Sequence, residues 1–217
     1  MKHNRSQSLE KFPATAVQMI LLIILSFLGG SIASTQSQTA RATFAGGCFW
    51  CVEEVFEHVD GVLSVTSGFT GGAHPSSYKD VSSGGTGHVE AVEIVYDPNR
   101  VTYDKLLEVF WKNIDPTDSS GQFCDRGAQY RSAIFYRTEE QKRKAEESVA
   151  GIQSQLKGKV VTPILPATEF YPAEAYHQDY SRKNPLPYKQ YRIRCGRDRR
   201  LRAIWGKAQQ QSETGAR

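Results

Sequence analysis

From about residue 42 onward, hydrophobic side chains alternate between the two-residue spacing of strands and the three-to-four-residue spacing of helices. Runs rich in Val, Thr and aromatic residues that end at turn residues predict strands. Amphipathic runs that follow Thr or a glycine pair predict helices. The predicted strands are 42–45, 61–70, 88–96, 132–136 and 160–165, and the predicted helices begin near Cys48, after Thr102 and after Thr138.

Strands and helices follow one another in the order β-α-β, β-α-β-α-β, with some connections short enough for antiparallel pairing. This order predicts an α+β fold in which helices pack on a mixed sheet, close to the split β-α-β type. Two long loops rich in turn residues, 71–87 and 115–129, interrupt the pattern. Loops of this length in a compact domain are usually functional. A segment rich in Pro and Tyr, 170–191, follows the last predicted strand.

The first 33 residues have the three parts of a secretory signal. A short basic region comes first, an apolar run over 17–28 follows, and small residues lead to Ala33. We expect cleavage after Ala33, which would make the protein periplasmic or secreted. The alternative is that residues 14–33 are retained as a membrane anchor, because this stretch is long enough to cross a bilayer.

Between a polar linker, 34–41, and a polar tail, 208–217, residues 42–207 suffice for one domain with a sizeable core. The formal net charge of +4 is small for 217 residues and does not indicate a nucleic-acid partner. The arginine-rich stretch 192–202 has no stacking aromatic residues on one face, so we predict a solvated C-terminal helix there. We expect a monomer.

The candidate chemistry centres on Cys48, which follows Gly46-Gly47 and precedes apolar residues at helical spacing. A helix N-terminus stabilises an anion through its unpaired N–H groups and its dipole, so we expect a lowered pKa for this thiol. Cys51 lies on the same helical face, three residues further on. A disulfide between these two would close almost no chain and would stabilise little, so we interpret the pair as redox-active.

Cys124 and Cys195 bring the cysteines to an even number. In an exported protein they could form one structural disulfide, which we favour, or Cys195 could pass electrons to a partner. Zinc binding at Cys48-x-x-Cys51 would need a second pair of ligands, and no second Cys-x-x-Cys or pair of closely spaced histidines follows. We therefore predict no metal site.

Five separated segments resemble the A-type peptide methionine sulfoxide reductases, and together they span about residues 42–205 in the order of that family. They are GCFWCVE, a Ser-rich loop with Tyr78, GTGHVEAVEIVYDP, DRGAQYRSAIF and His177-Gln178-x-Tyr180. The resemblance implies an α+β fold with a ferredoxin-like core and long ordered loops. It also implies reduction of the S epimer of methionine sulfoxide, either free or within oxidised proteins and peptides.

The resemblance implies catalytic roles for four residues. Cys48 would attack the sulfoxide sulfur, and Glu90 would donate a proton to the departing oxygen. To do so at neutral pH, the carboxyl group must be kept protonated by an apolar site. Tyr78 and Tyr130 would hydrogen-bond the oxygen as charge develops on it. Taken alone, Glu90 is better explained as an exposed polar position on a strand, and Tyr78, Tyr130, Phe49 and Trp50 are better explained as core aromatics.

Substrate-binding roles are implied for Phe49, Trp50 and Asp125. The two aromatic rings would form an apolar wall for the substrate methyl group, where sulfur and methyl groups contact rings favourably. Asp125 matches a polar residue that the family uses to fix the substrate. We expect His177 to be structural.

Attack would leave a sulfenic acid on Cys48, which condenses with a nearby thiol to a disulfide. Many relatives have Gly in place of Cys51 and use a cysteine near the C-terminus, so we predict that Cys51 resolves the sulfenic acid here. A thioredoxin-type protein or a dithiol would then reduce the disulfide, with no bound cofactor. Two other classes remain open: a general thiol–disulfide exchanger, and a non-enzymatic zinc or interaction module.

Overall fold

The computed structural model describes residues 39–206. The predicted signal peptide, its alternative as a membrane anchor and the polar tail lie outside the described residues, so their structures stay untested. Among residues 39–206, no helix has the length and apolar character needed to span a bilayer.

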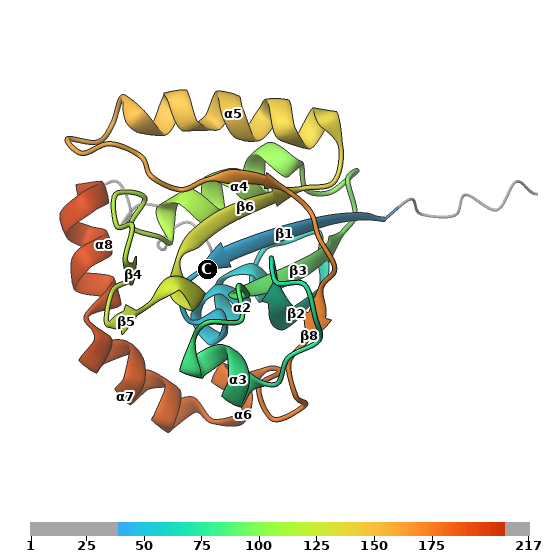
Figure 1. The fold of residues 1–217 in the computed structure, drawn as a ribbon. Helices are drawn as coiled ribbons and strands as arrows, with labels where there is room; N and C mark the ends of the chain where they lie inside the picture. Colours follow the sequence, from blue (N-terminus) through green and yellow to red (C-terminus); the bar gives the residue numbers. More distant parts are fainter. Residues whose placement is uncertain (1–38, 207–217) are drawn as a thin grey trace, which may run out of the picture. The chain divides into compact units, whose positions relative to one another are not determined.

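A six-stranded mixed sheet forms the centre of the described part (Figure 1). Neighbouring strands pair antiparallel except for β6 and β7, which pair in parallel. Across the sheet the strands are β7 (Ile164–Pro166), β6 (Ser132–Tyr136), β1 (Ala40–Gly46), β3 (Val89–Tyr96), β2 (Val62–Thr70) and β8 (Tyr171–Pro172).

Two helices and four of these strands make the core of the fold. Along the chain they are β1, α2 (Phe49–Glu57), β2, β3, α4 (Tyr103–Lys112) and β6, and across the sheet the four strands lie in the order β6-β1-β3-β2. This is the ferredoxin-like arrangement, so the predicted α+β class with a ferredoxin-like core is confirmed.

The remaining elements surround this core. They are α3 (Tyr78–Ser83), β4 (Gly121–Gln122), β5 (Asp125–Arg126), the 3-10 helix η1 (Ala128–Tyr130), α5 (Glu139–Gln153), α6 (Tyr180–Lys183), α7 (Pro185–Cys195) and α8 (Arg197–Trp205). The long predicted loop 71–87 thus contains a short helix, which a capping box of Ser77 and Asp80 begins. The second predicted loop, 115–129, contains the β4–β5 hairpin.

Strand boundaries agree with the sequence prediction to within one residue except at two strands. The first strand begins at Ala40 rather than at residue 42. The predicted strand 160–165 is reduced to β7 at Ile164–Pro166, because the backbone N–H of Val161 bonds to the carbonyl of Pro116 instead of to a strand. The first part of this stretch is therefore a loop.

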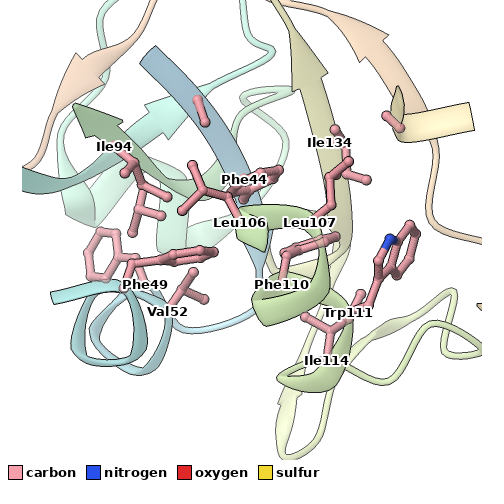
Figure 2. Packing of buried hydrophobic residues seen from close by; sticks show 14 of the residues in the cluster. Phe44, Phe49, Val52, Ile94, Leu106, Leu107, Phe110, Trp111, Ile114 and Ile134 are labelled. Carbon is pink, nitrogen blue, oxygen red and sulfur yellow. The ribbon is translucent and has the colours of Figure 1, made fainter. Parts of the chain in front are cut away.

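The main hydrophobic core lies between the sheet and the helices α2 and α4 (Figure 2). Phe44 on β1 stacks on Phe110 of α4 at 4.9 Å and on Phe56 of α2 at 5.4 Å between ring centroids. Val92 and Ile94 of β3 face the same core. Residues between them, such as Ala91, belong to a smaller cluster on the opposite face of the sheet. This alternation decides which β3 side chains reach the helices.

Candidate active site

Cys48 is the N-cap residue of α2, directly after the end of β1. Its side chain makes no capping hydrogen bond, so the sulfur stays available for chemistry. Gly47 has φ of +81°, and a Cβ on it would lie 2.5 Å from the Cβ of Gln122. Glycine is therefore needed here both for the turn and for the close approach of the β4–β5 hairpin. The glycine pair of the sequence sets the position of the thiol.

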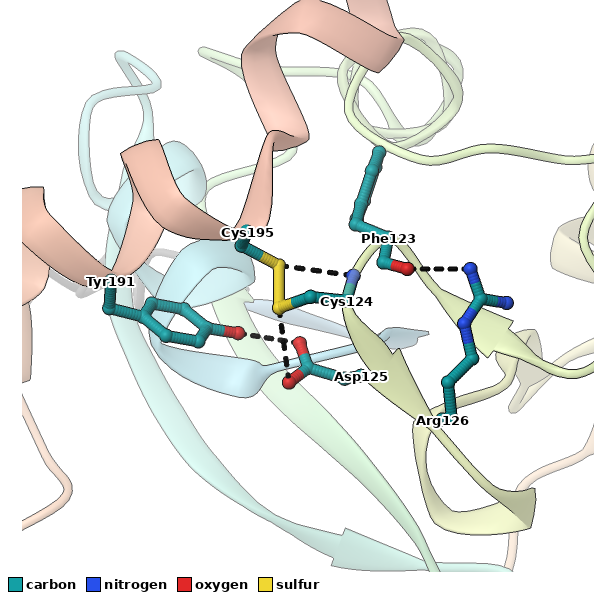
Figure 3. Close-up of a disulfide and its surroundings, with 6 residues drawn as sticks. All are labelled: Phe123, Cys124, Asp125, Arg126, Tyr191 and Cys195. Carbon is teal, nitrogen blue, oxygen red and sulfur yellow. Dashed lines mark hydrogen bonds between the residues drawn. A yellow bond between two sulfur atoms is a disulfide. The ribbon is translucent and has the colours of Figure 1, made fainter.

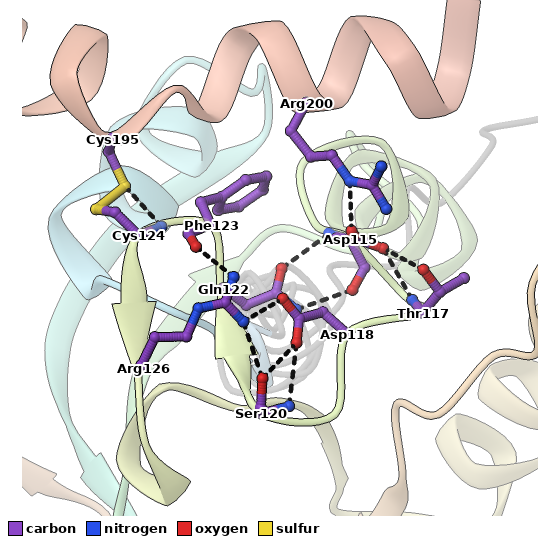
Figure 4. A network of polar contacts seen from close by, with 10 residues as sticks. All are labelled: Asp115, Thr117, Asp118, Ser120, Gln122, Phe123, Cys124, Arg126, Cys195 and Arg200. Atoms are coloured by element: carbon purple, nitrogen blue, oxygen red, sulfur yellow. Dashed lines mark hydrogen bonds and ion pairs between the residues drawn. A yellow bond between two sulfur atoms is a disulfide. The ribbon is translucent and has the colours of Figure 1, made fainter.

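A polar network ties that hairpin to the segment before it, and this segment in turn to α8 (Figure 4). The Gln122 side chain accepts from the backbone N–H of Asp115 and donates to its carbonyl, both at 2.8 Å. Arg200 of α8 donates to the Asp115 carboxylate at 2.7 Å. Arg126 donates to Asp118 at 2.6 Å. The two bonds between Gln122 and Asp115 are buried, and the contacts together fix the position of the loop that carries Asp125.

Glu90 lies beneath the N-terminus of α2. Glu90 alternates with Val92 and Ile94 along β3, so its side chain points to the same helix-covered face of the sheet as theirs. It is 2% exposed. Its Oε2 accepts the backbone N–H of Phe49 at 3.0 Å. Burial raises the pKa of Glu90 to about 8, against the opposing effect of this hydrogen bond. The carboxyl group is therefore protonated at neutral pH, as the sequence analysis required of a proton donor.

Cys48 and Cys51 are both free thiols and both buried, with Cys48 at 7% exposed. Burial raises the pKa of Cys48 well above its usual range, and the adjacent Cys51 and Glu90 add to the rise. A hydrogen bond from Cys48 lowers the pKa of Cys51 to about 6, with help from Arg197 and Arg192. The expected low pKa is thus found on the second cysteine, because Cys51 accepts the hydrogen bond from Cys48 and is also stabilised as an anion by the positive charges of Arg197 and Arg192. At neutral pH the two sulfurs share one proton.

Two tyrosines adjoin this centre. Burial, with contributions from Glu90 and Cys48, raises the pKa of Tyr78 to about 12. Burial and the same two groups also raise the pKa of Tyr130. Both hydroxyls therefore keep their protons and can donate hydrogen bonds. They come from different elements, because Tyr78 begins α3 and Tyr130 ends η1.

Phe49 and Trp50 belong to a cluster of aromatic rings. Phe49 lies 6.2 Å from Tyr78 between ring centroids, and Trp50 stacks on Tyr180 at 3.8 Å. The indole N–H of Trp50 donates to Nδ1 of His177 at 3.1 Å. The histidine is buried and its ring also packs against Phe49 at 5.1 Å. It therefore supports both rings of the predicted apolar wall.

Asp125 accepts a hydrogen bond of 2.5 Å from the hydroxyl of Tyr191 on α7 (Figure 3). Cys124, the residue before it, forms a disulfide with Cys195 at the end of α7, with the Cα atoms 4.9 Å apart. The favoured pairing of these two cysteines is thus present. The disulfide joins the hairpin that carries Asp125 to the helix that carries Tyr191.

The structure brings together Cys48, Cys51, Glu90, Tyr78, Tyr130 and Asp125, since each perturbs the pKa of another member of the group or has its own pKa perturbed by one. Helix α7 also contributes to this group, which the sequence did not predict. Tyr188 and Tyr191 of this helix pack against the two thiols. Together with Cys195 they have the three- and four-residue spacing of one helical face, a signal that the Tyr-rich segment did contain.

The prediction of a solvated arginine-rich helix over 192–202 is wrong for two of its arginines. Gly196 adopts a left-handed conformation with φ of +69°, which ends α7 and turns the next residue inward. Arg197 is 1% exposed. Arg192 is partly buried, where it donates to Asp198 at 2.9 Å and to the hydroxyl of Tyr188 at 3.1 Å. The break that Gly196 makes between α7 and α8 therefore accounts for the burial of Arg197.

Comparison with known sequences gives a consistent result. The sequence model of the family "Peptide methionine sulfoxide reductase" matches residues 40–209. A peptide methionine sulfoxide reductase MsrA of Bacillus licheniformis is 52% identical over 169 residues, which cover 76% of this chain and 93% of the relative. MsrA 2 of Caulobacter vibrioides is 48% identical over 187 residues, which cover 85% of this chain and 94% of the relative.

Solved structures agree with the sequence comparison. The reduced form of Mxr1 from Saccharomyces cerevisiae is similar with a TM-score of 0.66 and 32% identity, covering 70% of this chain and 88% of that one. Methionine sulfoxide reductase A of Corynebacterium diphtheriae is similar with a TM-score of 0.63 and 36% identity, covering 70% of this chain and 78% of that one.

Proposed function

The chain belongs to the A type of the peptide methionine sulfoxide reductase family and is a thiol-dependent oxidoreductase, and from this premise we propose how its residues carry out the reaction. The observation that carries the proposal is the contact between Glu90 and the backbone N–H of Phe49, at 3.0 Å. It fixes a buried, protonated carboxyl group beside the residue that follows Cys48. A nucleophile and a proton donor thus adjoin one space at the start of α2.

The sulfur of Cys48 attacks the sulfoxide sulfur while its proton passes to the thiolate of Cys51. Glu90 protonates the sulfoxide oxygen, and Tyr78 and Tyr130 donate hydrogen bonds to it. The oxygen leaves with Cys48 as a sulfenic acid, and the reduced thioether departs. Phe49 and Trp50 hold the methyl group of the substrate. The substrate is the S epimer, either free or within an oxidised polypeptide, and Asp125 fixes its polar part.

Cys51 then displaces the hydroxyl of the sulfenic acid on Cys48, releasing water and forming a disulfide. In sum two thiols are oxidised to a disulfide, while the sulfoxide is reduced to a thioether and water. Glu90 is left as a carboxylate and regains a proton from solvent. This assignment is supported by the positions of the four cysteines. Cys195 is bonded to Cys124, whereas Cys51 shares a hydrogen bond with Cys48.

A disulfide between residues three apart is a suitable substrate for a dithiol donor, so a thioredoxin-type protein or a small dithiol completes the cycle. The signal-like residues 1–33 support export and a donor outside the cytoplasm, with oxidised exported proteins as the substrates. N-terminal sequencing of the protein from its host tests export. Export is supported by a mature chain that begins at Ser34, and a chain retaining residues 1–33 in the cytoplasmic fraction contradicts it.

Separated epimers of methionine sulfoxide test the reaction itself. With a dithiol as reductant, we expect turnover of the S epimer and none of the R epimer. Mass mapping after one turnover without reductant then tests the resolving cysteine. We expect a Cys48–Cys51 disulfide with Cys124–Cys195 unchanged, and a Cys48–Cys195 link with Cys51 free would rule out the assignment.

A further inference from the structure

Arg197 is a buried cation without a carboxylate partner among residues 39–206. It is 1% exposed, and its guanidinium forms no ion pair in the described part of the chain. Its hydrogen bonds go to two backbone carbonyls, those of Asn113 at 2.7 Å and Gly46 at 3.3 Å. Its Nε has no partner in the described structure. A buried charge is costly unless something compensates for it.

The carbonyl partners provide part of that compensation. Asn113 is the C-cap of α4, where the helix dipole is negative. The face of Phe123 lies 4.4 Å from the guanidinium carbon, which is a favourable cation–π distance. These contacts explain how Arg197 is held in place. None of them supplies a full negative charge.

The contact of Arg197 with the carbonyl of Gly46 places it close to the active site. Gly46 is the last residue of β1, two positions before Cys48. The positive charge of Arg197 acts on both Cys51 and Asp125. The other titratable or charged groups around the two sulfurs are Glu90, Tyr78, Tyr130, Asp125, Tyr188, Tyr191 and Arg192. Arg192 already pairs with Asp198, so its charge is shared.

We propose that Arg197 is the counter-cation of the negative charge shared by Cys48 and Cys51, and that it keeps one of the two sulfurs ionised before the substrate binds. It is a positioning residue, because it acts on the thiols through the electric field and touches neither them nor the substrate. The effect of Arg197 on turnover rests on the proposed function. Its effect on the ionisation of the thiols does not, so the proposal about Arg197 and the proposed function can fail separately.

Three variants separate the charge of Arg197 from its packing. Arg197→Gln keeps an amide donor for the carbonyl of Asn113 but removes the charge. Arg197→Lys keeps the charge. Arg199→Gln removes the same charge from the exposed side of the same helix and serves as the control. The measurement is the ultraviolet absorbance of thiolate against pH, with the Cys124–Cys195 disulfide intact and a Cys48→Ser, Cys51→Ser double variant as the blank.

In the wild type we expect thiolate to form with a midpoint near pH 6. Arg197→Gln should raise this midpoint by about one unit or more, a tenfold loss of thiolate below the midpoint. Arg197→Lys and Arg199→Gln should leave it within a few tenths of a unit. A Gln variant that titrates like the wild type overturns the proposal, as does an equal shift in Arg199→Gln.

If Arg197→Gln does not fold, the stability of the wild type against Cys51→Ser decides the question. A pKa of about 6 for Cys51 in the folded state lies below that of the unfolded thiol. The thiolate should therefore raise the unfolding free energy of the wild type relative to Cys51→Ser. The full effect should be present above pH 9 and should be lost as the pH falls through 6. A difference in unfolding free energy that does not change with pH means that no buried anion exists for Arg197 to balance.

Discussion

The two cysteine pairs of this enzyme lie close to one active site and differ in nearly every physical respect. Cys48 and Cys51 are buried, reduced and three residues apart on one helix. Cys124 and Cys195 are bonded to each other across a sequence separation of 71, and Cys124 is exposed. One pair is held together by secondary structure, whereas the other joins two separate parts of the fold.

The difference shows what each pair can contribute. A bond between Cys48 and Cys51 constrains the unfolded chain very little, so forming or breaking it has a small effect on folding and the pair can be oxidised and reduced in every turnover. The Cys124–Cys195 bond closes a long loop and fastens the Asp125 hairpin to α7. Its effect should be on stability and on the position of Asp125 and Tyr191.

The largest expected effect is that of Cys48→Ser. A serine hydroxyl is a far weaker nucleophile than a thiol, so turnover of methionine sulfoxide should fall by about 10³-fold or more. The Cys124→Ser, Cys195→Ser double variant is the matched control for loss of a cysteine. If Cys48→Ser retained substantial turnover with a dithiol, another cysteine would be the nucleophile.

Glu90→Gln should lower kcat/KM by about 10²- to 10⁴-fold, because the amide cannot donate the proton. A pKa of about 8 for Glu90 means that the donor form is present below pH 8 and lost above it, while the Cys51 thiolate forms above about pH 6. The wild-type rate should therefore rise through pH 6 and fall through pH 8. In Glu90→Gln the fall near pH 8 should disappear.

Stability provides a second check on the same carboxyl group. Since the folded state raises the pKa of Glu90 above the ordinary 4.5, the wild type should lose stability relative to Glu90→Gln as the pH rises from 4.5 through 8. Denaturant titrations at several pH values measure this. A thiol–disulfide exchanger that makes no use of Glu90 would show the stability effect but keep its rate.

Replacing both Cys124 and Cys195 by Ser should cost stability rather than chemistry. The loop-closure relation for a separation of 71 residues gives about 4 kcal/mol of unfolding free energy. Turnover with a dithiol should fall less than tenfold, since Cys48 and Cys51 remain. Denaturant unfolding and initial rates measure the two effects. A loss of turnover as large as that of Cys48→Ser would place the second pair inside the catalytic cycle.

Much of the fold followed from the sequence, because local patterns decide it. The alternation along β3 and the glycine pair before Cys48 place the acid and the thiol where the structure has them. Glu90 needs an apolar site to stay protonated. Whether it has one depends on which face of β3 is covered by α2. Spacing in sequence gives alternation but does not say which face is buried.

The parts that the sequence did not predict come from tertiary contacts. A single left-handed glycine, Gly196, turns Arg197 into the interior, and a run of arginines gives no sign of this. The lowered pKa was expected on Cys48 from the helix N-terminus. It lies on Cys51, because burial dominates at Cys48, whereas Cys51 is stabilised as an anion by the hydrogen bond from Cys48 and then by the arginines of α7 and α8. The tyrosines of α7 were missed because their spacing indicates a shared helical face but does not say that this face packs against the thiols.

Tyr191→Phe should give the smallest effect and the sharpest test of the division between the pairs. It removes the hydroxyl that donates to Asp125 at 2.5 Å but keeps the ring that contacts Trp50. One hydrogen bond of about 1 kcal/mol corresponds to about a fivefold loss in kcat/KM. Tyr136→Phe removes the same hydroxyl from β6, where the ring contacts Lys142, and should have no effect.

Combining Tyr191→Phe with the Cys124→Ser, Cys195→Ser substitutions then shows whether the disulfide acts through this hydrogen bond. If it holds Tyr191 against Asp125, its removal should lower kcat/KM in the wild type and have little further effect in Tyr191→Phe. Independent, additive losses would mean that the disulfide stabilises the fold without positioning Asp125. The second cysteine pair would then have no part in the catalytic site, and the contrast between the two pairs would be complete.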